Sequence, residues 1–172
     1  TIGDPRWGVS DLNANQLIML KKASSMSPTE TSVRIVWQTP ESASAVSIVN
    51  YGPTSALGST ITGPDGWLIA GEGYMHEVTI TGLQPFTQYF YRVGNGTDFA
   101  VETNMTRTAP AKGTNFRLMS VSDIHSNDLQ LWHGISQKAV KDSADMTVFI
   151  GDFINDGSIR TEWNGGFFTP GE

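Results

Sequence analysis

Three side chains that could bind a metal ion occur in two short motifs. Asp123 and His125 are separated by one residue in Ser-Asp-Ile-His, and Asp152 lies in Gly-Asp-Phe-Ile-Asn-Asp-Gly. Carboxylate oxygens and imidazole nitrogens suit Fe, Zn or Mn ions, and ligand type alone does not select among these metals. Because the chain has no cysteine, disulfides, thiolate nucleophiles and zinc–sulfur sites are excluded. Two ions held roughly 3.5 to 4 Å apart form the clamp used to hydrolyse phosphate esters, so the motifs predict a metal site for phosphate chemistry.

Each motif follows an apolar run of the kind that forms a buried strand. Residues 116–121 and 146–150 are compact apolar runs suited to strands covered on both faces, and apolar residues recur at helical spacing over residues 129–140. The order strand, helix, strand predicts a βαβ unit with a parallel sheet, which binds ligands at the carboxyl ends of its strands. If the strands are adjacent, Asp123 and Asp152 lie close together, because neighbouring strands are about 4.8 Å apart.

A structural role is the alternative for each of these residues. An Asp-x-His triplet is a weak signal by itself, since an Asp at the end of a strand often only caps the next turn. The place of both motifs, directly after apolar runs with a helix between them, favours the metal site. For Asn155 two interpretations stay open, an outer hydrogen-bond partner of the site or a plain turn residue.

The first part of the chain predicts an antiparallel β-sandwich over about residues 13–106. The clearest strand covers residues 31–38, where Val33, Ile35 and Trp37 share one face. Further strands are expected at residues 17–23, 46–51, 76–81, 89–93 and 99–103.

Length, composition and charge limit the number of domains and the classes of function. The chain has 172 residues with 18 Gly, 8 Pro and 16% charged residues, which favours one large or two small domains with a β bias. A Pro- and Gly-containing stretch predicts a boundary that separates residues 1–110 from 111–172. The formal net charge of −6 argues against bulk nucleic-acid binding, which needs a basic face. The longest apolar runs are far shorter than the roughly 20 residues of a membrane span.

In this order, the two motifs resemble the opening blocks of the calcineurin-like metallophosphoesterases, Asp-x-His and then Gly-Asp-x-x-Asp/Asn. The preceding region resembles the fibronectin type III-like N-terminal domain of purple acid phosphatases. Residues 76–94 read HEVTITGLQPFTQYFYRVG and match that domain's signature, H-x-V-x-L-x-x-L-x-P-x-T-x-Y-x-Y-x-V, with Ile80 in place of Leu. The resemblance implies a fibronectin type III/Ig-like β-sandwich followed by the opening β-α-β of an α/β metallophosphoesterase domain.

The same resemblance implies roles for the motif residues. Asp123 and His125 would bind the first of two metal ions, Asp152 would bridge both, and a bridging hydroxide would attack the phosphorus of a small phosphate ester. Purple acid phosphatases carry a colour-giving Tyr where this chain has Asn155, and Gly where it has His125, so a colourless site is expected. No residue of this chain is identifiable as a catalytic acid or base. The family's later His-containing blocks are missing from the 172 residues, so we expect the N-terminal portion of a longer enzyme, inactive or nearly so by itself.

Two classes of function stay open. The leading one is a secreted or periplasmic metal-dependent phosphoesterase. The alternative is a non-catalytic, fibronectin-like protein- or glycan-binding module with a vestigial βαβ tail. The sequence predicts neither a preference for monoesters or diesters nor an oligomeric state.

Some residues outside the metal motifs also carry expectations. His76 is expected to pack or hydrogen-bond inside the sandwich rather than to bind metal. Trp67 is expected in a small satellite core rather than on the surface. Asn95-Gly96-Thr97 and Asn104-Met105-Thr106 fit the N-glycosylation acceptor pattern, which has meaning only in a secreted eukaryotic protein.

Overall fold

The chain divides into two compact units, which are described separately here. A computed structural model describes residues 16–124 and 129–163. The sandwich unit spans Thr1–Ala111 and the βαβ unit spans Lys112–Glu172. No helix in the described part of the chain has the length and apolar character needed to cross a bilayer.

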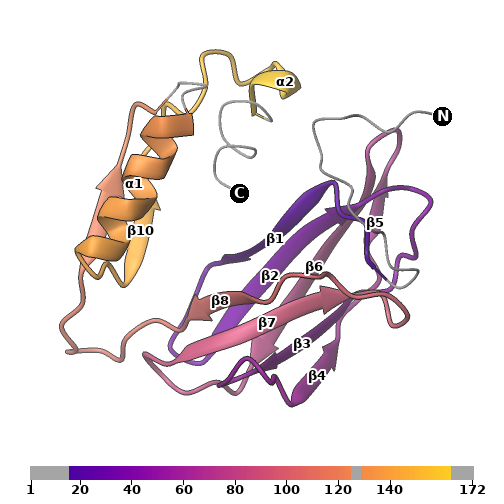
Figure 1. Ribbon diagram of the computed structural model, residues 1–172, viewed down its shortest axis with the longest axis horizontal. Coiled ribbons are helices and arrows are strands. Elements are labelled where there is room, and N and C mark those ends of the chain that lie inside the picture. Colours follow the sequence, from indigo (N-terminus) through magenta and orange to yellow (C-terminus); the bar gives the residue numbers. More distant parts are fainter. Residues whose placement is uncertain (1–15, 125–128, 164–172) are drawn as a thin grey trace. The chain divides into compact units, whose positions relative to one another are not determined.

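The sandwich unit is built from two four-stranded sheets in which every paired neighbour is antiparallel (Figure 1). The strand order is β1-β2-β6-β5 in one sheet and β4-β3-β7-β8 in the other. The strands are β1 (Lys21–Met26), β2 (Ser32–Thr39), β3 (Ile48–Gly52), β4 (Ser59–Thr62), β5 (Trp67–Ile69), β6 (Gly73–Thr81), β7 (Gln88–Gly94) and β8 (Asn104–Arg107). The predicted β-sandwich is therefore confirmed.

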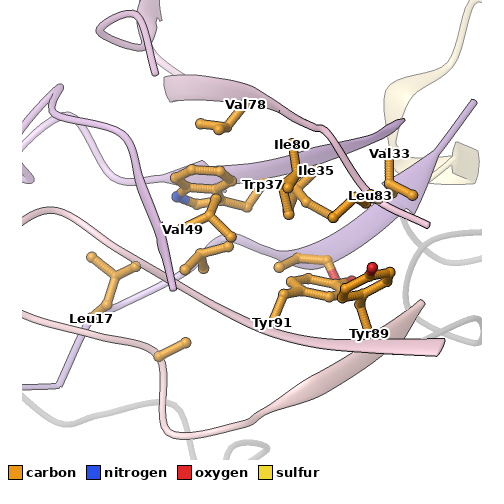
Figure 2. Close-up of a cluster of buried hydrophobic side chains, with 13 residues drawn as sticks. Leu17, Val33, Ile35, Trp37, Val49, Val78, Ile80, Leu83, Tyr89 and Tyr91 are labelled. Atoms are coloured by element: carbon orange, nitrogen blue, oxygen red, sulfur yellow. The ribbon is translucent and has the colours of Figure 1, made fainter. Parts of the chain in front are cut away.

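Side chains from both sheets meet in one hydrophobic core (Figure 2). On β2 the alternation is as expected, because Val33, Ile35 and Trp37 are all at most 1% exposed while Arg34 is exposed on the other face. Strand β6 contributes Val78 in the same way. The core consists of Leu17, Ala23, Val33, Ile35, Trp37, Val49, Val78, Ile80, Leu83, Tyr89, Tyr91, Val93 and Ala100. Burial of these apolar side chains is the main stabilising contribution to the unit.

Side-chain hydroxyls close the loop that leads into β7. The Tyr89 hydroxyl accepts a hydrogen bond from the Gln84 backbone N–H at 3.0 Å, which is the arrangement of a tyrosine corner. The buried Thr108 hydroxyl accepts from the Thr87 N–H at 2.9 Å and donates to the Gln84 carbonyl at 2.6 Å. These bonds satisfy backbone groups that the sheets leave unpaired, and they fasten the segment after β8 to the loop before β7.

The described part of the βαβ unit contains β9 (Leu118–Val121), α1 (Leu129–Lys141), β10 (Met146–Phe149) and the short helix α2 (Arg160–Trp163). Strands β9 and β10 are parallel neighbours with Leu118 opposite Met146 and Val121 opposite Phe149. Helix α1 carries Lys138 and Lys141 in its last turn, where positive charge favours the helix dipole. The predicted strand–helix–strand order is confirmed.

The strands of this unit are only partly buried. Their apolar runs suit strands covered on both faces, but a sheet with only these two strands is expected to expose apolar surface, and Leu118 is 52% exposed and Phe149 is 37% exposed. Ile150, which follows β10, is 61% exposed. The physical reason is that a sheet of two strands with one crossover helix has too few elements to cover two faces. Ile124 is the one fully buried hydrophobic side chain among those described in this unit.

In the sandwich unit two expectations are wrong and one is confirmed only in part. The strand expected at residues 17–23 begins at Lys21, and residues 99–103 contain only two isolated bridges of Phe99, to Gln16 and to Gly94, in place of a strand. Trp67 lies on the edge strand β5 and is 52% exposed, so it belongs to no satellite core. Edge strands are where a large aromatic side chain lacks neighbours on one side, which explains its exposure.

Candidate metal centre

The two candidate aspartates follow neighbouring parallel strands at the same edge of their sheet. Asp123 comes two residues after the end of β9, and Asp152 comes three residues after the end of β10. The Ile150 N–H donates to the Val121 carbonyl at 2.8 Å, which continues the ladder one residue past β10. Parallel strands end in the same direction, so this register carries both carboxylates to the carboxyl edge, where sheets of this kind bind ligands.

Both aspartates have left-handed backbone conformation. The φ angle is 55° at Asp123 and 52° at Asp152. Asp tolerates this region better than most residues with a side chain, although it is still strained relative to Gly. Gly151, with φ of 72°, also has positive φ, and it directly precedes Asp152. The turn after β10 therefore begins at Gly151, one residue before Asp152. Both aspartates are exposed.

The third predicted ligand, His125, lies outside the described residues. Within residues 16–124 and 129–163, no group of three or more His, Cys, Asp or Glu side chains is arranged to hold a metal ion. The described carboxylates are chemically suited to a hard or borderline cation, and a nitrogen donor two residues after Asp123 would complete the donor types. His133 lies on α1, and its side chain is not described.

The segment after Asp152 is held by a hydrogen-bonded turn. Asn155 is exposed in a bend, and Asp156 accepts from the Ser158 N–H at 2.9 Å and the Ser158 hydroxyl at 2.6 Å. These bonds lower the pKa of Asp156. The Glu162 carboxylate accepts from the Asp156 N–H at 2.8 Å, and the Trp163 indole N–H donates to the Gly157 carbonyl at 3.0 Å, so two side chains of α2 bind the turn. This network fixes the loop that follows the candidate site.

A groove lies between β9 and α1, apart from the two aspartates. Its volume is about 510 Å³, and neither Asp123 nor Asp152 lines it. The groove is lined by Met119, Ser120, Val121, Leu131, Gly134, Ile135, Lys138 and Asp142. Most of these side chains are apolar, so the groove differs in chemistry from the carboxylate edge.

In the sandwich unit, His76 is fully buried and structural. Its Nε2 is 2.8 Å from the Thr39 hydroxyl and its Nδ1 is 2.9 Å from the Ser47 hydroxyl. A neutral imidazole has one donor and one acceptor nitrogen, so one hydroxyl accepts and the other donates. The ring stacks on Trp37 with centroids 4.8 Å apart and an angle of 5° between the planes.

Burial also controls the protonation of this ring. Desolvation lowers the pKa of His76 to about 4, and the charge of Asp65 offsets only part of that effect. The expected packing and hydrogen-bonding role of His76 is confirmed, because both ring nitrogens already have partners inside the protein.

Comparison with known proteins places the sandwich unit in a family. The family model for the purple acid phosphatase N-terminal domain matches residues 22–109. The chain belongs to this family. The match begins in β1 and ends two residues after β8, so this N-terminal domain includes all eight strands of the sandwich. No curated protein matches the sequence.

Solved structures with a similar fold include the protein titled "Structure of PhoD". It has 16% sequence identity and a TM-score of 0.57, and the match covers 86% of this chain and 30% of that chain. The sensor domain of the anti-sigma factor RsgI4 from Pseudobacteroides cellulosolvens matches at 16% identity and a TM-score of 0.41, over 58% of this chain and all of that domain. A fibronectin type III domain of the human KIAA0970 protein matches at 15% identity and a TM-score of 0.39, over 55% of this chain and 76% of that domain.

The PhoD match reaches beyond the purple acid phosphatase N-terminal domain. The sandwich unit holds 111 of the 172 residues, which is less than the 86% of the chain that the match covers. The shared fold therefore extends into the βαβ unit. The chain spans 30% of the length of PhoD. Membership of the purple acid phosphatase N-terminal family points to a protein of a phosphoesterase family.

Proposed function

We propose that this chain is the N-terminal portion of a metal-dependent enzyme that hydrolyses phosphate esters. The observation that carries the proposal is the parallel register of β9 and β10, which brings Asp123 and Asp152 to one sheet edge. The family match supports the same conclusion from the other unit. Two carboxylates at the carboxyl ends of adjacent parallel strands are a typical starting point for a metal site in an α/β domain.

The proposed roles follow from the donor types. Asp123 and His125 would hold one ion, Asp152 would lie between that ion and a second, and Asn155 would support the site through a hydrogen bond. Bound ions of this kind supply Lewis acidity and lower the pKa of water. Fe, Zn and Mn all fit oxygen and imidazole donors. The resemblance assigns three donors in these 172 residues, Asp123, His125 and Asp152, so we expect the 172-residue chain alone to hold an incomplete two-metal site.

The left-handed conformation of both aspartates agrees with this proposal. Non-glycine residues in strained backbone regions cluster at ligand-binding and active sites. The two values, 55° and 52°, occur two residues after the end of β9 and three residues after the end of β10.

The experiment is metal analysis and hydrolysis with the complete gene product. We expect bound Fe, Zn or Mn and hydrolysis of p-nitrophenyl phosphate or of bis-p-nitrophenyl phosphate, and the ratio of the two activities gives the substrate class. Asp152→Asn should reduce the activity at least about a hundredfold, since it removes the charge from the proposed bridging position. Asp142→Asn, an exposed change after α1, is the matched control and should leave activity intact.

Full activity in Asp152→Asn would refute the bridging role. A gene product without the family's later His-containing blocks, and without bound metal, would refute the enzyme. It would instead favour the binding module, for which the exposed Trp67 and Leu68 on the edge strand β5 would be the first contact residues to test.

Export from the cytoplasm, to the periplasm or outside the cell, is part of the same proposal. A cysteine-free chain does not depend on the redox state of its compartment, so export is compatible with its composition. Fractionation of the source organism tests the location, and recovery only in the cytoplasm would refute it.

A further inference from the structure

The sandwich unit contains two Asn-x-Thr acceptor patterns in different structural settings. Asn95-Gly96-Thr97 lies in the loop after β7, and Asn104-Met105-Thr106 lies within β8. The acceptor pattern alone does not distinguish the two asparagines. Their backbone conformations and neighbouring residues distinguish them.

Asn95 begins a tight turn that presents its side-chain amide. Its Oδ1 accepts from the Thr97 N–H at 3.0 Å and from the Asp98 N–H at 2.7 Å, and its own N–H donates to the Asp98 carbonyl at 3.0 Å. Gly96 has φ of 94° and is exposed, as is Thr97. This is an Asx turn, in which the side-chain oxygen accepts backbone hydrogen bonds and the side-chain nitrogen takes no part in the turn.

The Nδ2 atom of Asn95 is open to solvent. No hydrogen bond from it occurs among the described residues, and the described buried polar atoms without a partner are only Trp37 Nε1 and Arg92 Nε. A side-chain nitrogen that is neither bonded nor buried must contact water. The turn therefore holds Asn95 by its oxygen and exposes the nitrogen that N-glycosylation modifies.

Asn104 is also half-buried, but it lies within the edge strand β8 and not in a turn. It pairs with Tyr91 and Thr106 pairs with Tyr89, and both tyrosines are buried core residues. Directly opposite residues of an antiparallel pair point to the same face of the sheet, so Asn104 and Thr106 point to the core side. Met105 between them is 62% exposed on the other face. The half-buried Asn104 side chain therefore lies on the side of the core tyrosines, within a paired strand and not in an exposed turn.

We infer that Asn95, and not Asn104, is an N-glycosylation site of this protein when it passes through a eukaryotic secretory pathway. The substrate is an oligosaccharide linked to a lipid diphosphate. Asn95 Nδ2 forms a bond to the anomeric carbon, the bond from that carbon to the diphosphate oxygen breaks, the lipid diphosphate leaves, and one amide proton passes to a base of the transferase. The inference is independent of hydrolysis, because it concerns only the sandwich unit.

The test is secretion of the full 172-residue chain, fused to a leader, from cultured eukaryotic cells. We expect the secreted wild-type protein to carry one glycan, which peptide N-glycosidase removes with conversion of Asn95 to Asp. Thr97→Ala should abolish the glycan, since the acceptor pattern needs the hydroxyl, while Thr97→Ser should retain it. The exposed Thr97 side chain makes no hydrogen bond in the described structure, and only its backbone N–H serves the turn, so both variants should fold.

Thr106→Ala is the matched control at the second pattern and should leave the single glycan in place. Asn95→Gln removes the acceptor itself, and like Thr97→Ala it should show only the mass of its own unmodified polypeptide. A wild-type protein secreted without glycan would overturn the inference. So would a glycan that survives in both Thr97→Ala and Asn95→Gln, because it would then sit on Asn104.

Discussion

Asp123 and Asp152 each carry a carboxylate and each adopt a positive φ angle, and substitutions can test the charge and the backbone conformation separately. Asn and Asp both tolerate positive φ, whereas Ala does so at a cost of about 1 kcal/mol. We expect Asp123→Asn and Asp152→Asn to leave the free energy of unfolding within about 0.5 kcal/mol of wild type, and the Ala variants to lose about 1 kcal/mol more. Urea denaturation followed by tryptophan fluorescence measures the difference. Equal stability of the Asn and Ala variants would show that the turn is not strained.

His76 makes the stability of the sandwich unit depend on pH. Its pKa is about 4 in the folded protein against 6.5 as the ordinary value, so the unfolded chain takes up a proton first. The stability contributed by the neutral ring is present above about pH 6.5 and is lost as the pH falls towards 4. The loss is about 3 kcal/mol at most, by the usual conversion of a pKa shift into free energy.

Chemical denaturation at pH 7.5, 5.5 and 4.5 would test this prediction. In His76→Gln, which retains hydrogen-bonding capacity for Thr39 and Ser47, overall stability should be lower and this part of the pH slope should disappear. Other carboxylates titrate in both proteins, so the comparison isolates the imidazole. An unchanged slope in the variant would contradict the role given to His76.

At the scale of the elements, Thr108 links the end of β8 to the loop before β7. Thr108→Val preserves the shape of the side chain but leaves the Thr87 N–H and the Gln84 carbonyl without their partner. A buried polar group without a hydrogen bond costs roughly 1 to 3 kcal/mol. We expect a loss of about 2 kcal/mol in the free energy of unfolding, measured by thermal or urea denaturation. Thr60→Val, on the exposed edge strand β4, is the control and should change stability little.

The long strands of the sandwich could be predicted because their alternation is strong. Residues 31–38 were expected and Ser32–Thr39 was found, since three core side chains on one face specify both the element and its orientation. The two parallel strands and the helix between them could also be predicted, because apolar runs of that length and order have few other arrangements.

The short edge strands could not be predicted from local sequence. Strand β8 has one hydrophobic residue, Met105, and that residue is exposed, so no pattern marks it. Its place is set by pairing with β7, which is a tertiary interaction. A strand was predicted from Phe99 onward. The Arg92 guanidinium carbon lies 5.1 Å from the centroid of the Phe99 ring, and the Phe99 carbonyl accepts a hydrogen bond from the Leu17 N–H.

The candidate site could be predicted in part. Motif order and strand periodicity place Asp123 and Asp152 at one sheet edge, and the register of β9 and β10 agrees. The positive φ angles could not be foreseen, because Asp occurs at strand ends in many conformations. The metal-binding roles of Asp123, His125 and Asp152 stay predictions, as do the division at residue 110 into two functional domains and the role of Asn155.

At the scale of the whole molecule, the two units differ in how much hydrophobic surface they bury. All 13 residues of the core cluster belong to the sandwich unit, whereas Ile124 is the one buried hydrophobic side chain described in the βαβ unit. Since local stability follows buried apolar contact, the βαβ unit should open first. We expect backbone amides of β9 and β10 to exchange hydrogen at least about tenfold faster than those of β2 and β6.

Hydrogen-exchange mass spectrometry on the full 172-residue chain measures both units in one sample. Mild trypsin treatment is an independent check, because Lys112 and Arg117 are exposed and lie between the sandwich core and β9. Early cleavage there should release a protease-resistant sandwich. Uniform protection across both units would contradict the difference in stability.

The left-handed turns at Asp123 and Asp152 have a genetic consequence. Every Asp codon becomes an Asn codon by one change in its first base, and a Gly codon by one change in its second. Asn and Gly are the residues that adopt positive φ most readily. A single base change can therefore remove a carboxylate from this sheet edge without straining the chain. If the proposed function holds, natural variants with Asn or Gly at these two places should keep the fold and have lost the hydrolytic activity.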